Sequence, residues 1–346
     1  MSLVADRRTA PGEPLVLNRL QPHQHHELRL QVGHTDGTEI RVHVLIGAQA
    51  RPCLALVAGI HGDEYDGILA LQGVVQDVAA DLLAGSLLVI PVANPLAFSA
   101  AARHTPEDGR DLNRVFPGNP KGTVTERLAS LLCDNVLIAS DLIFSLHGAR
   151  ATSTLLPWME FLDVPGELGA RSLAAARASG FARLVALPPL PGRLMTAMAA
   201  RGIPVIEGEL GGRGEATSAN VSAYRNSVER VAQHLGVLHG TLNEMLPEPQ
   251  LWDLHEITSP AAGIFLSNVE LGASVWQGDV LGRVFDDAGD ELAVIRAPVD
   301  ATVAGMRAHA GVTPGDGLFA LLTTRSTSDI GSGVVSDRVP GSEPLP

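Results

Sequence analysis

Two short segments of the chain place a histidine directly after an apolar run and beside a glycine. His61 and Glu64 follow the run 53–58, and His147 follows a second run, 142–146. Short continuous apolar runs of this kind are typical of strands buried on both faces of a parallel sheet. Because the carboxyl ends of such strands border the crevice where ligands bind, we expect these three side chains to meet there.

Two imidazoles and one carboxylate form a ligand set with a specific chemistry. A catalytic zinc ion takes three protein ligands and keeps one position open, and two histidines with one glutamate are a known set. The sequence therefore predicts one Zn2+ per chain, held by His61, Glu64 and His147. The alternative is that both histidines are ordinary polar residues at strand ends, and their matching placement favours the metal.

A polar segment between predicted elements, 103–118, brings three arginines and an asparagine close together in the sequence. The planar guanidinium of arginine binds a carboxylate through two bonds, or stabilises an oxyanion. Beside a metal, such a segment predicts a small anionic substrate. Without a metal, a solvated charged turn would explain the same residues equally well.

Composition limits the classes of partner. The 346 residues are 45% hydrophobic and carry a net charge of −13, and no basic run occurs, so neither nucleic acid nor an anionic membrane is an expected partner. The N-terminal segment lacks the apolar stretch of a secretory signal, which predicts a cytoplasmic protein. Cys53 and Cys133 are expected to be buried free thiols.

The order of predicted elements indicates an α/β fold. An antiparallel hairpin is expected over 26–32 and 39–45, and apolar runs then alternate with helical patterns as far as 238. This alternation predicts a mixed, mostly parallel sheet with helices on both faces. The catalytic domain is expected to span 26–245, after a disordered lead-in over 1–25.

From about residue 246 the pattern changes to short β-like runs, which predict a small all-β domain over 246–325 and a disordered tail over 326–346. The segments 259–281 and 297–318 repeat one pattern and resemble the two halves of a biotinyl/lipoyl-like barrel-sandwich domain. Such domains carry their cofactor on a lysine, and the only lysine is Lys121. A carrier role is therefore excluded.

Four motifs stand in the order seen in the succinylglutamate desuccinylase/aspartoacylase family, which the chain resembles over about residues 25–325. The resemblance is greatest to the branch of N-acetyl-diaminobutyrate deacetylases. It implies a zinc carboxypeptidase-like fold for the catalytic domain. The motifs are His61-Gly62-Asp63-Glu64, Asp111-Leu112-Asn113-Arg114, Leu146-His147-Gly148 and Glu209-Leu210-Gly211-Gly212.

The resemblance also implies residue roles. The three zinc ligands are those named above, and Glu209 would be the general base, with Glu207 as a rival two residues away. Asn113 and Arg114 would bind the carboxylate of the substrate. Arg103 would polarise the carbonyl that is cleaved, with Arg110 as the alternative for that role or for binding the substrate.

The predicted function is zinc-dependent hydrolysis of the amide bond in a small N-acylated amino acid. A zinc carboxypeptidase acting on a peptide or amide is the first alternative, and a non-catalytic metal-binding scaffold or sensor is the second. The segments Gly59-Ile60 and Gly148-Ala149-Arg150 differ from those of the deacetylase branch, so the acyl group and the amine are left open. A homo-oligomer, most simply a dimer, is expected.

Overall fold

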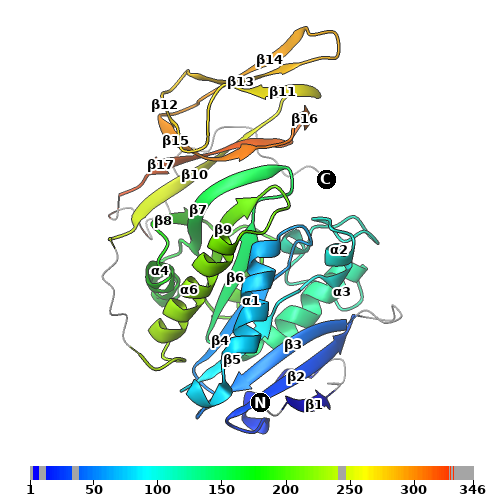
Figure 1. Cartoon of the computed structure of the whole chain (residues 1–346), viewed down its shortest axis with the longest axis vertical. Coiled ribbons are helices and arrows are strands. Elements are labelled where there is room, and N and C mark those ends of the chain that lie inside the picture. The colour runs from blue at the N-terminus through cyan, green and yellow to red at the C-terminus, as the bar shows by residue number, and fades with distance from the viewer. Residues whose placement is uncertain are drawn as a thin grey trace.

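The structure is a computed structural model with a mixed α/β fold built on one long sheet (Figure 1). In Figure 1 the N-terminal strands lie at the lower end of the molecule and the C-terminal strands at the upper end. Of residues 3–7 only the backbone is described. The described residues are 3–7, 13–32, 39–240, 247–326, 328 and 330.

Four parallel strands form the centre of a 13-stranded sheet. In spatial order they are β5 (Ser86–Ile90), β4 (Cys53–Ala58), β6 (Leu142–Gly148) and β9 (Val205–Gly212). Every residue of β4 and β5 is buried, as their continuous apolar runs predict. Because the four strands are parallel, the segments that follow β4, β6 and β9 meet at one edge of the sheet.

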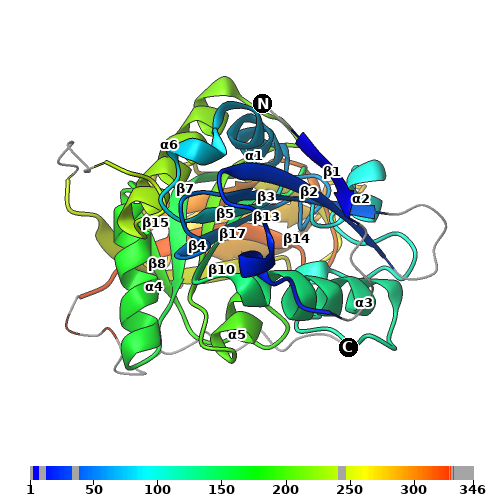
Figure 2. The ribbon, with the colours of Figure 1, turned by 90° about the horizontal axis from the view of Figure 1, so that it is seen from below.

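Alternate residues of β4 pack into two different hydrophobic cores, one on each face of the sheet. One core is covered by α3 (Val124–Ser130) and α5 (Leu194–Ala199). The other is covered by α1 (Tyr65–Asp77), α4 (Glu167–Ala178) and α6 (Ser218–His234). Figure 2 shows the sheet between these two layers of helices, and the prediction of an α/β fold with helices on both faces is confirmed.

Antiparallel strands flank the parallel centre on both sides. The predicted hairpin is present as β2 (Gln24–Gln31) and β3 (Glu39–Ile46), and β3 is antiparallel to β5. On the other side, β7 (Ser153–Leu162) is antiparallel to β9 and parallel to β8 (Arg183–Leu187). The sheet is therefore parallel at its centre and mixed at its flanks.

The helix predicted after the polar segment begins as expected. Thr123 and Glu126 form a capping box, in which the Thr123 amide donates to Glu126 Oε2 at 2.8 Å. After α3 the chain continues as a π-helix, η4 (Leu131–Val136), and a 3-10 helix, η5 (Leu137–Ala139). No helix in the described part of the chain is both long and apolar enough to cross a bilayer.

The N-terminal segment contributes regular structure. β1 (Leu3–Arg7) pairs in parallel with β2, and the 3-10 helix η1 (Leu17–Arg19) places Leu17 in the core. These parts of the lead-in 1–25 are therefore not the disordered segment that composition predicts. The expected disordered tail, 326–346, lies almost entirely outside the described residues. The remaining short helix η2 (Ala80–Leu82) precedes β5.

The C-terminal strands continue the same sheet and add a second one. β10 (Gln250–Thr258) pairs in parallel with β8, and β15 (Ala301–Arg307) pairs with β7. A four-stranded sheet packs against them around its own apolar core. The expected boundary at 245 therefore lies between units that share a sheet. The other strands are β11 (Gly263–Ser267), β12 (Ser274–Val275), β13 (Val280–Phe285), β14 (Glu291–Arg296), β16 (Gly311–Val312) and β17 (Gly317–Thr324).

Candidate active site

The loop between β4 and α1 depends on two glycines. Gly59 has a φ of +62°, a left-handed conformation that favours glycine. At Gly62 a Cβ would lie 2.0 Å from the carbonyl carbon of Ala97, in the short helix α2 (Pro95–Ser99), so a side chain cannot fit. The two glycines allow the loop to turn back sharply, which brings His61 and Glu64 inward at the end of β4.

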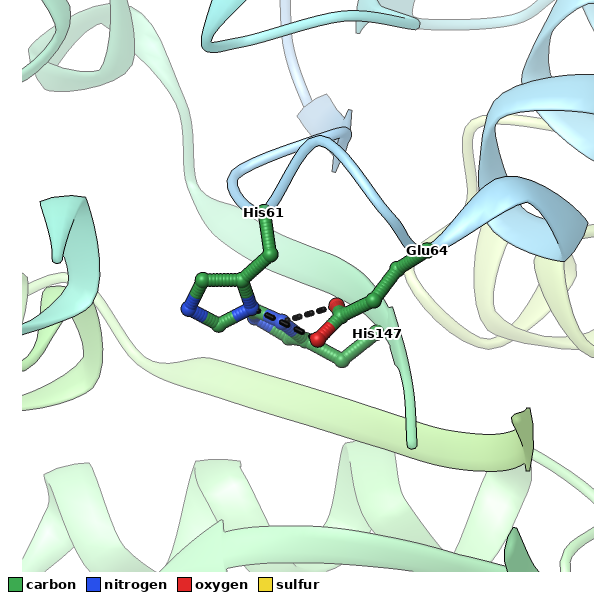
Figure 3. A group of neighbouring side chains, drawn as sticks. All are labelled: His61, Glu64 and His147. Atoms are coloured by element: carbon green, nitrogen blue, oxygen red, sulfur yellow. Dashed lines mark hydrogen bonds and ion pairs between the residues drawn. The ribbon is translucent and has the colours of Figure 1, made fainter. Parts of the chain in front are cut away.

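The three predicted ligands lie together. The carboxylate of Glu64 faces both imidazoles, with His61 Nδ1 at 2.7 Å from Oε1 and His147 Nδ1 at 3.1 Å from Oε2 (Figure 3). All three side chains are buried, and one ligand atom from each lies within 4.8 Å of the others. Segments 83 residues apart in the sequence thus converge on one point, as the strand-end argument predicts.

The outer nitrogen of each imidazole also has a partner. His61 Nε2 lies 3.1 Å from Asp111 Oδ1, and His147 Nε2 lies 2.9 Å from Ser145 Oγ. Metal-binding histidines commonly use one nitrogen for the ion and hydrogen-bond the other, which fixes the ring orientation. With both Nδ1 atoms turned toward the Glu64 carboxylate, the donor set and its supporting contacts fit a divalent cation with nitrogen and oxygen ligands.

The electrostatics of the group also suit a cation. Burial opposes ionisation of Glu64, but the adjacent His61 and His147 hold its pKa well below the usual range. Burial likewise lowers the pKa of His147, but the Glu64 carboxylate outweighs it and raises that pKa to about 9. The buried Glu64 carboxylate therefore favours a positive charge beside it. A bound metal ion can supply that charge in place of a protonated imidazole.

Glu209 lies beside this group on the neighbouring strand. In the parallel pairing of β6 with β9, Glu209 is the register partner of His147. Burial raises the pKa of Glu209 well above its ordinary value; His147 opposes this rise, and nearby carboxylates add to it. The rival Glu207 is fully buried and lies 3.9 Å from Arg193, which also pairs with Glu160. The surroundings therefore favour Glu209 as the acid–base group.

The structure separates the two candidate arginines. Arg103 donates through Nε to Asp111 Oδ2 at 3.0 Å and through Nη1 to Glu64 Oε1 at 3.3 Å, so it lies against the candidate ligands. Arg110, whose side chain is 46% exposed, instead pairs with Glu126 of α3 at 3.0 Å. The geometry favours Arg103 for contact with a reacting group, and the structure does not bring Arg110 to the site.

Asn113 and Arg114 belong to the 3-10 helix η3 (Leu112–Arg114), next to Arg103 in space. Asn113 is buried, and its Oδ1 accepts a hydrogen bond from the Leu194 amide at 2.8 Å, which leaves its NH2 group to donate. Arg114 donates to the Asn113 carbonyl at 2.8 Å. Burial and the neighbouring Arg193 lower the pKa of Arg114, so its charge lies in a crowded electropositive region.

Sequence reasoning gave no role to three residues that support this site. Asp111 bridges His61 and Arg103. It opens the motif in which only Asn113 and Arg114 are assigned roles from the sequence. Tyr224, fully buried on α6, donates to the carbonyls of His147 and Gly208. Arg193, which pairs with the two buried carboxylates of Glu160 and Glu207, follows a Pro- and Gly-rich segment that carries no signal for such a role. For Asp111, its place in the motif Asp111-Leu112-Asn113-Arg114, next to Arg110, is the available signal.

Comparisons with known proteins agree with this geometry. Residues 50–235 match the model of the succinylglutamate desuccinylase/aspartoacylase catalytic domain. The chain is 31% identical over 307 residues to the N-alpha-acetyl-L-2,4-diaminobutyric acid deacetylase of Halomonas elongata, covering 85% of this chain and 89% of that protein.

Solved structures give the same result. The product-bound ectoine utilization protein EutE (DoeB) of Ruegeria pomeroyi has a TM-score of 0.80 and 28% identity, with 87% of this chain and 95% of that chain covered. A succinylglutamate desuccinylase/aspartoacylase of Rhodobacter sphaeroides has a TM-score of 0.79 and 25% identity, with 88% of this chain and 95% of that chain covered. The similarity therefore extends over both the α/β unit and most of the C-terminal strands.

Proposed function

The chain belongs to the succinylglutamate desuccinylase/aspartoacylase family, and on this basis we propose that it is a zinc-dependent hydrolase of the amide bond in a small N-acyl amino acid. The observation that carries the proposal is the buried group of His61, Glu64 and His147 with Glu209 beside it. The activity named for the Halomonas relative, a deacetylase of an N-acetyl amino acid, supports the same reaction class.

His61, Glu64 and His147 would hold the ion. When bound, zinc supplies Lewis-acid chemistry, since it acidifies water and polarises a carbonyl. Glu209 accepts the proton of the water that attacks the amide carbon. It then returns this proton to the nitrogen as the carbon–nitrogen bond breaks, so that a carboxylic acid and a free amine leave. The partly buried position of Glu209 beside His147 supports this role.

The remaining polar residues orient the substrate. Arg103, held against the candidate ligands by Asp111, donates hydrogen bonds to the oxygen on which negative charge develops. The NH2 group of Asn113 and the guanidinium of Arg114 bind the carboxylate of the amino acid. Because these two residues lie near Arg103, which contacts the candidate ligands, they would favour N-acyl amino acids of small size.

Several broader predictions are part of the same proposal. We assign the α/β unit to the zinc carboxypeptidase-like class and the C-terminal strands to the barrel-sandwich class. We also propose a homodimer in the cytoplasm. Sedimentation analysis would test the dimer, since a monomer at working concentration would contradict it.

The function is tested by incubating the zinc-loaded protein with a panel of N-acyl amino acids and, separately, with short peptides, and by mass spectrometry of the products. We expect one or more N-acyl amino acids to yield the free amino acid and the acid in equal amounts, and a chelator to stop the reaction. Cleavage of peptides alone would replace the proposal with a carboxypeptidase. Bound zinc without cleavage of either class would support a scaffold or sensor.

A further inference from the structure

Four residues after the end of the second apolar run, Arg150 lies at the rim of the site. Its guanidinium interacts electrostatically with Arg103 and Arg114, so three arginines face one region. Arg103 is held by Asp111, and Arg114 by the Asn113 carbonyl. Arg150 makes no side-chain hydrogen bond or ion pair with any residue that the structure describes.

The backbone that carries Arg150 is nonetheless fixed. On one side of it, the Gly148 amide donates to Glu64 Oε2 at 3.1 Å, and on the other the Ala151 amide donates to Asp63 Oδ2 at 3.1 Å. Both acceptors belong to the loop that carries the candidate metal ligands. The backbone at Arg150 is therefore fixed relative to the metal group, which keeps the side chain within reach of the site.

The charges around Arg150 do not balance. Arg150 is exposed at this rim. Partial desolvation lowers its pKa, the neighbouring Arg103 and Arg114 lower it further, and Asp111 and Glu256 oppose this shift. Asp111 is already engaged by Arg103 and His61. Glu256, from β10, is exposed and makes no hydrogen bond or ion pair within the described residues. Three guanidiniums thus face two carboxylates, and a bound anion relieves the repulsion that remains.

We infer that Arg150 determines specificity by binding a second carboxylate of the substrate, in addition to the one assigned to Asn113 and Arg114. This inference rests on the proposed function, because it places an N-acyl amino acid at the same site. The planar fork of an unpaired arginine matches a carboxylate through two charge-assisted bonds. The second carboxylate can belong to the amino acid side chain or to the acyl group. In either case the substrate carries two carboxylates.

The test compares acids with their amides. One pair is N-acetyl-L-glutamate and N-acetyl-L-glutamine, and the other is N-succinylglycine and its terminal amide. The wild-type protein should hydrolyse the acid of at least one pair with a kcat/KM roughly 10-fold or more above that of the amide. In Arg150→Gln this ratio should fall toward one through a higher KM for the acid, and Arg150→Lys should restore part of it.

A matched control removes an arginine elsewhere. Arg225 lies on α6 with a side chain that is 41% exposed and pairs with Asp77, so Arg225→Gln should leave the ratio unchanged. A ratio that is the same in Arg150→Gln as in the wild type, or no preference for either acid in the wild type, would overturn the assignment of Arg150.

A binding measurement tests the role of Arg150 independently of turnover. By calorimetry, the wild-type protein should bind glutarate about 10-fold more tightly than glutaramate, its monoamide, and Arg150→Gln should not discriminate. If no N-acyl amino acid of the full panel is hydrolysed but this difference in binding is present, the proposed function fails and the role of Arg150 stands. Equal binding of the two ligands by the wild-type protein would refute that role.

Discussion

Glu207 and Glu209 show how surroundings divide two identical side chains. They are two residues apart on one strand and share a face, but Glu207 lies near Arg193 while Glu209 lies beside His147. The resemblance assigns Glu209 as the general base, but the residue types alone leave Glu207 as a rival, because the contact that separates the two carboxylates comes from the distant Arg193. The same holds for Arg110, whose partner Glu126 lies on α3.

The candidate ligands were easier to predict. Residue type and position at the end of an apolar run together specify His61, Glu64 and His147, because parallel strands bring their carboxyl ends to one edge. Predicting these three ligands requires no knowledge of which way their side chains point. The contacts that fix the imidazole rings, such as that with Asp111, depend on the path of a loop and were not predictable in the same way.

At the residue scale, Glu209→Gln should remove the proton acceptor without removing a candidate metal ligand. We expect kcat to fall by about 100- to 10,000-fold, the usual contribution of general acid–base catalysis, and the bound zinc to remain at the wild-type level. Steady-state kinetics on a substrate found in the panel, with elemental analysis of the same sample, would measure both. Normal turnover in Glu209→Gln would exclude it as the base.

At the scale of elements, the site depends on how α6 is joined to the sheet. Tyr224 lies on the buried face of α6, and its hydroxyl donates to carbonyls of both β6 and β9. It thereby ties together the two strands that carry His147 and Glu209. The apolar periodicity predicts that α6 packs on the sheet, but it cannot predict this polar contact, which depends on the exact position of the helix along the strands.

Tyr224→Phe would leave the ring packing in place and remove the hydroxyl donor from two buried carbonyls. We expect the free energy of unfolding to fall by about 1–3 kcal/mol, the cost of leaving buried polar groups unsatisfied. Denaturant unfolding would measure it. The chain offers one matched control, its only other tyrosine, Tyr65, whose hydroxyl has no hydrogen bond among the described residues. Equal losses in Tyr224→Phe and Tyr65→Phe would argue against the bridging role.

At the scale of the whole molecule, the C-terminal strands are part of the fold that holds the site. A small core joins the two units, where Trp158, Val185 and Leu187 pack against Ala304 and Leu322. The sequence predicts an all-β unit from its short runs and turns. It does not predict that this unit extends the main sheet, because pairings such as Val185 with Trp252 join segments far apart in the chain.

Leu322 is fully buried in this shared core, so Leu322→Ala should destabilise both units together. We expect a loss of about 2–5 kcal/mol in a single cooperative unfolding transition, measured by calorimetry and denaturant unfolding. Leu266→Ala provides the control, because Leu266 is 56% exposed on the second sheet and its removal should change stability by less than about 0.5 kcal/mol. Two separate transitions, of which one alone shifts, would show that the units fold independently.

The central claim is that two histidines and a glutamate from separate segments hold one metal ion. Elemental analysis of purified zinc-loaded protein tests it most directly when the wild type is compared with His147→Ala and with His309→Ala, a change at an exposed histidine of the C-terminal unit. We predict about one zinc per chain in the wild type and in His309→Ala, and far less in His147→Ala, because two ligands do not hold the ion tightly. A full complement of zinc in His147→Ala would contradict the claim.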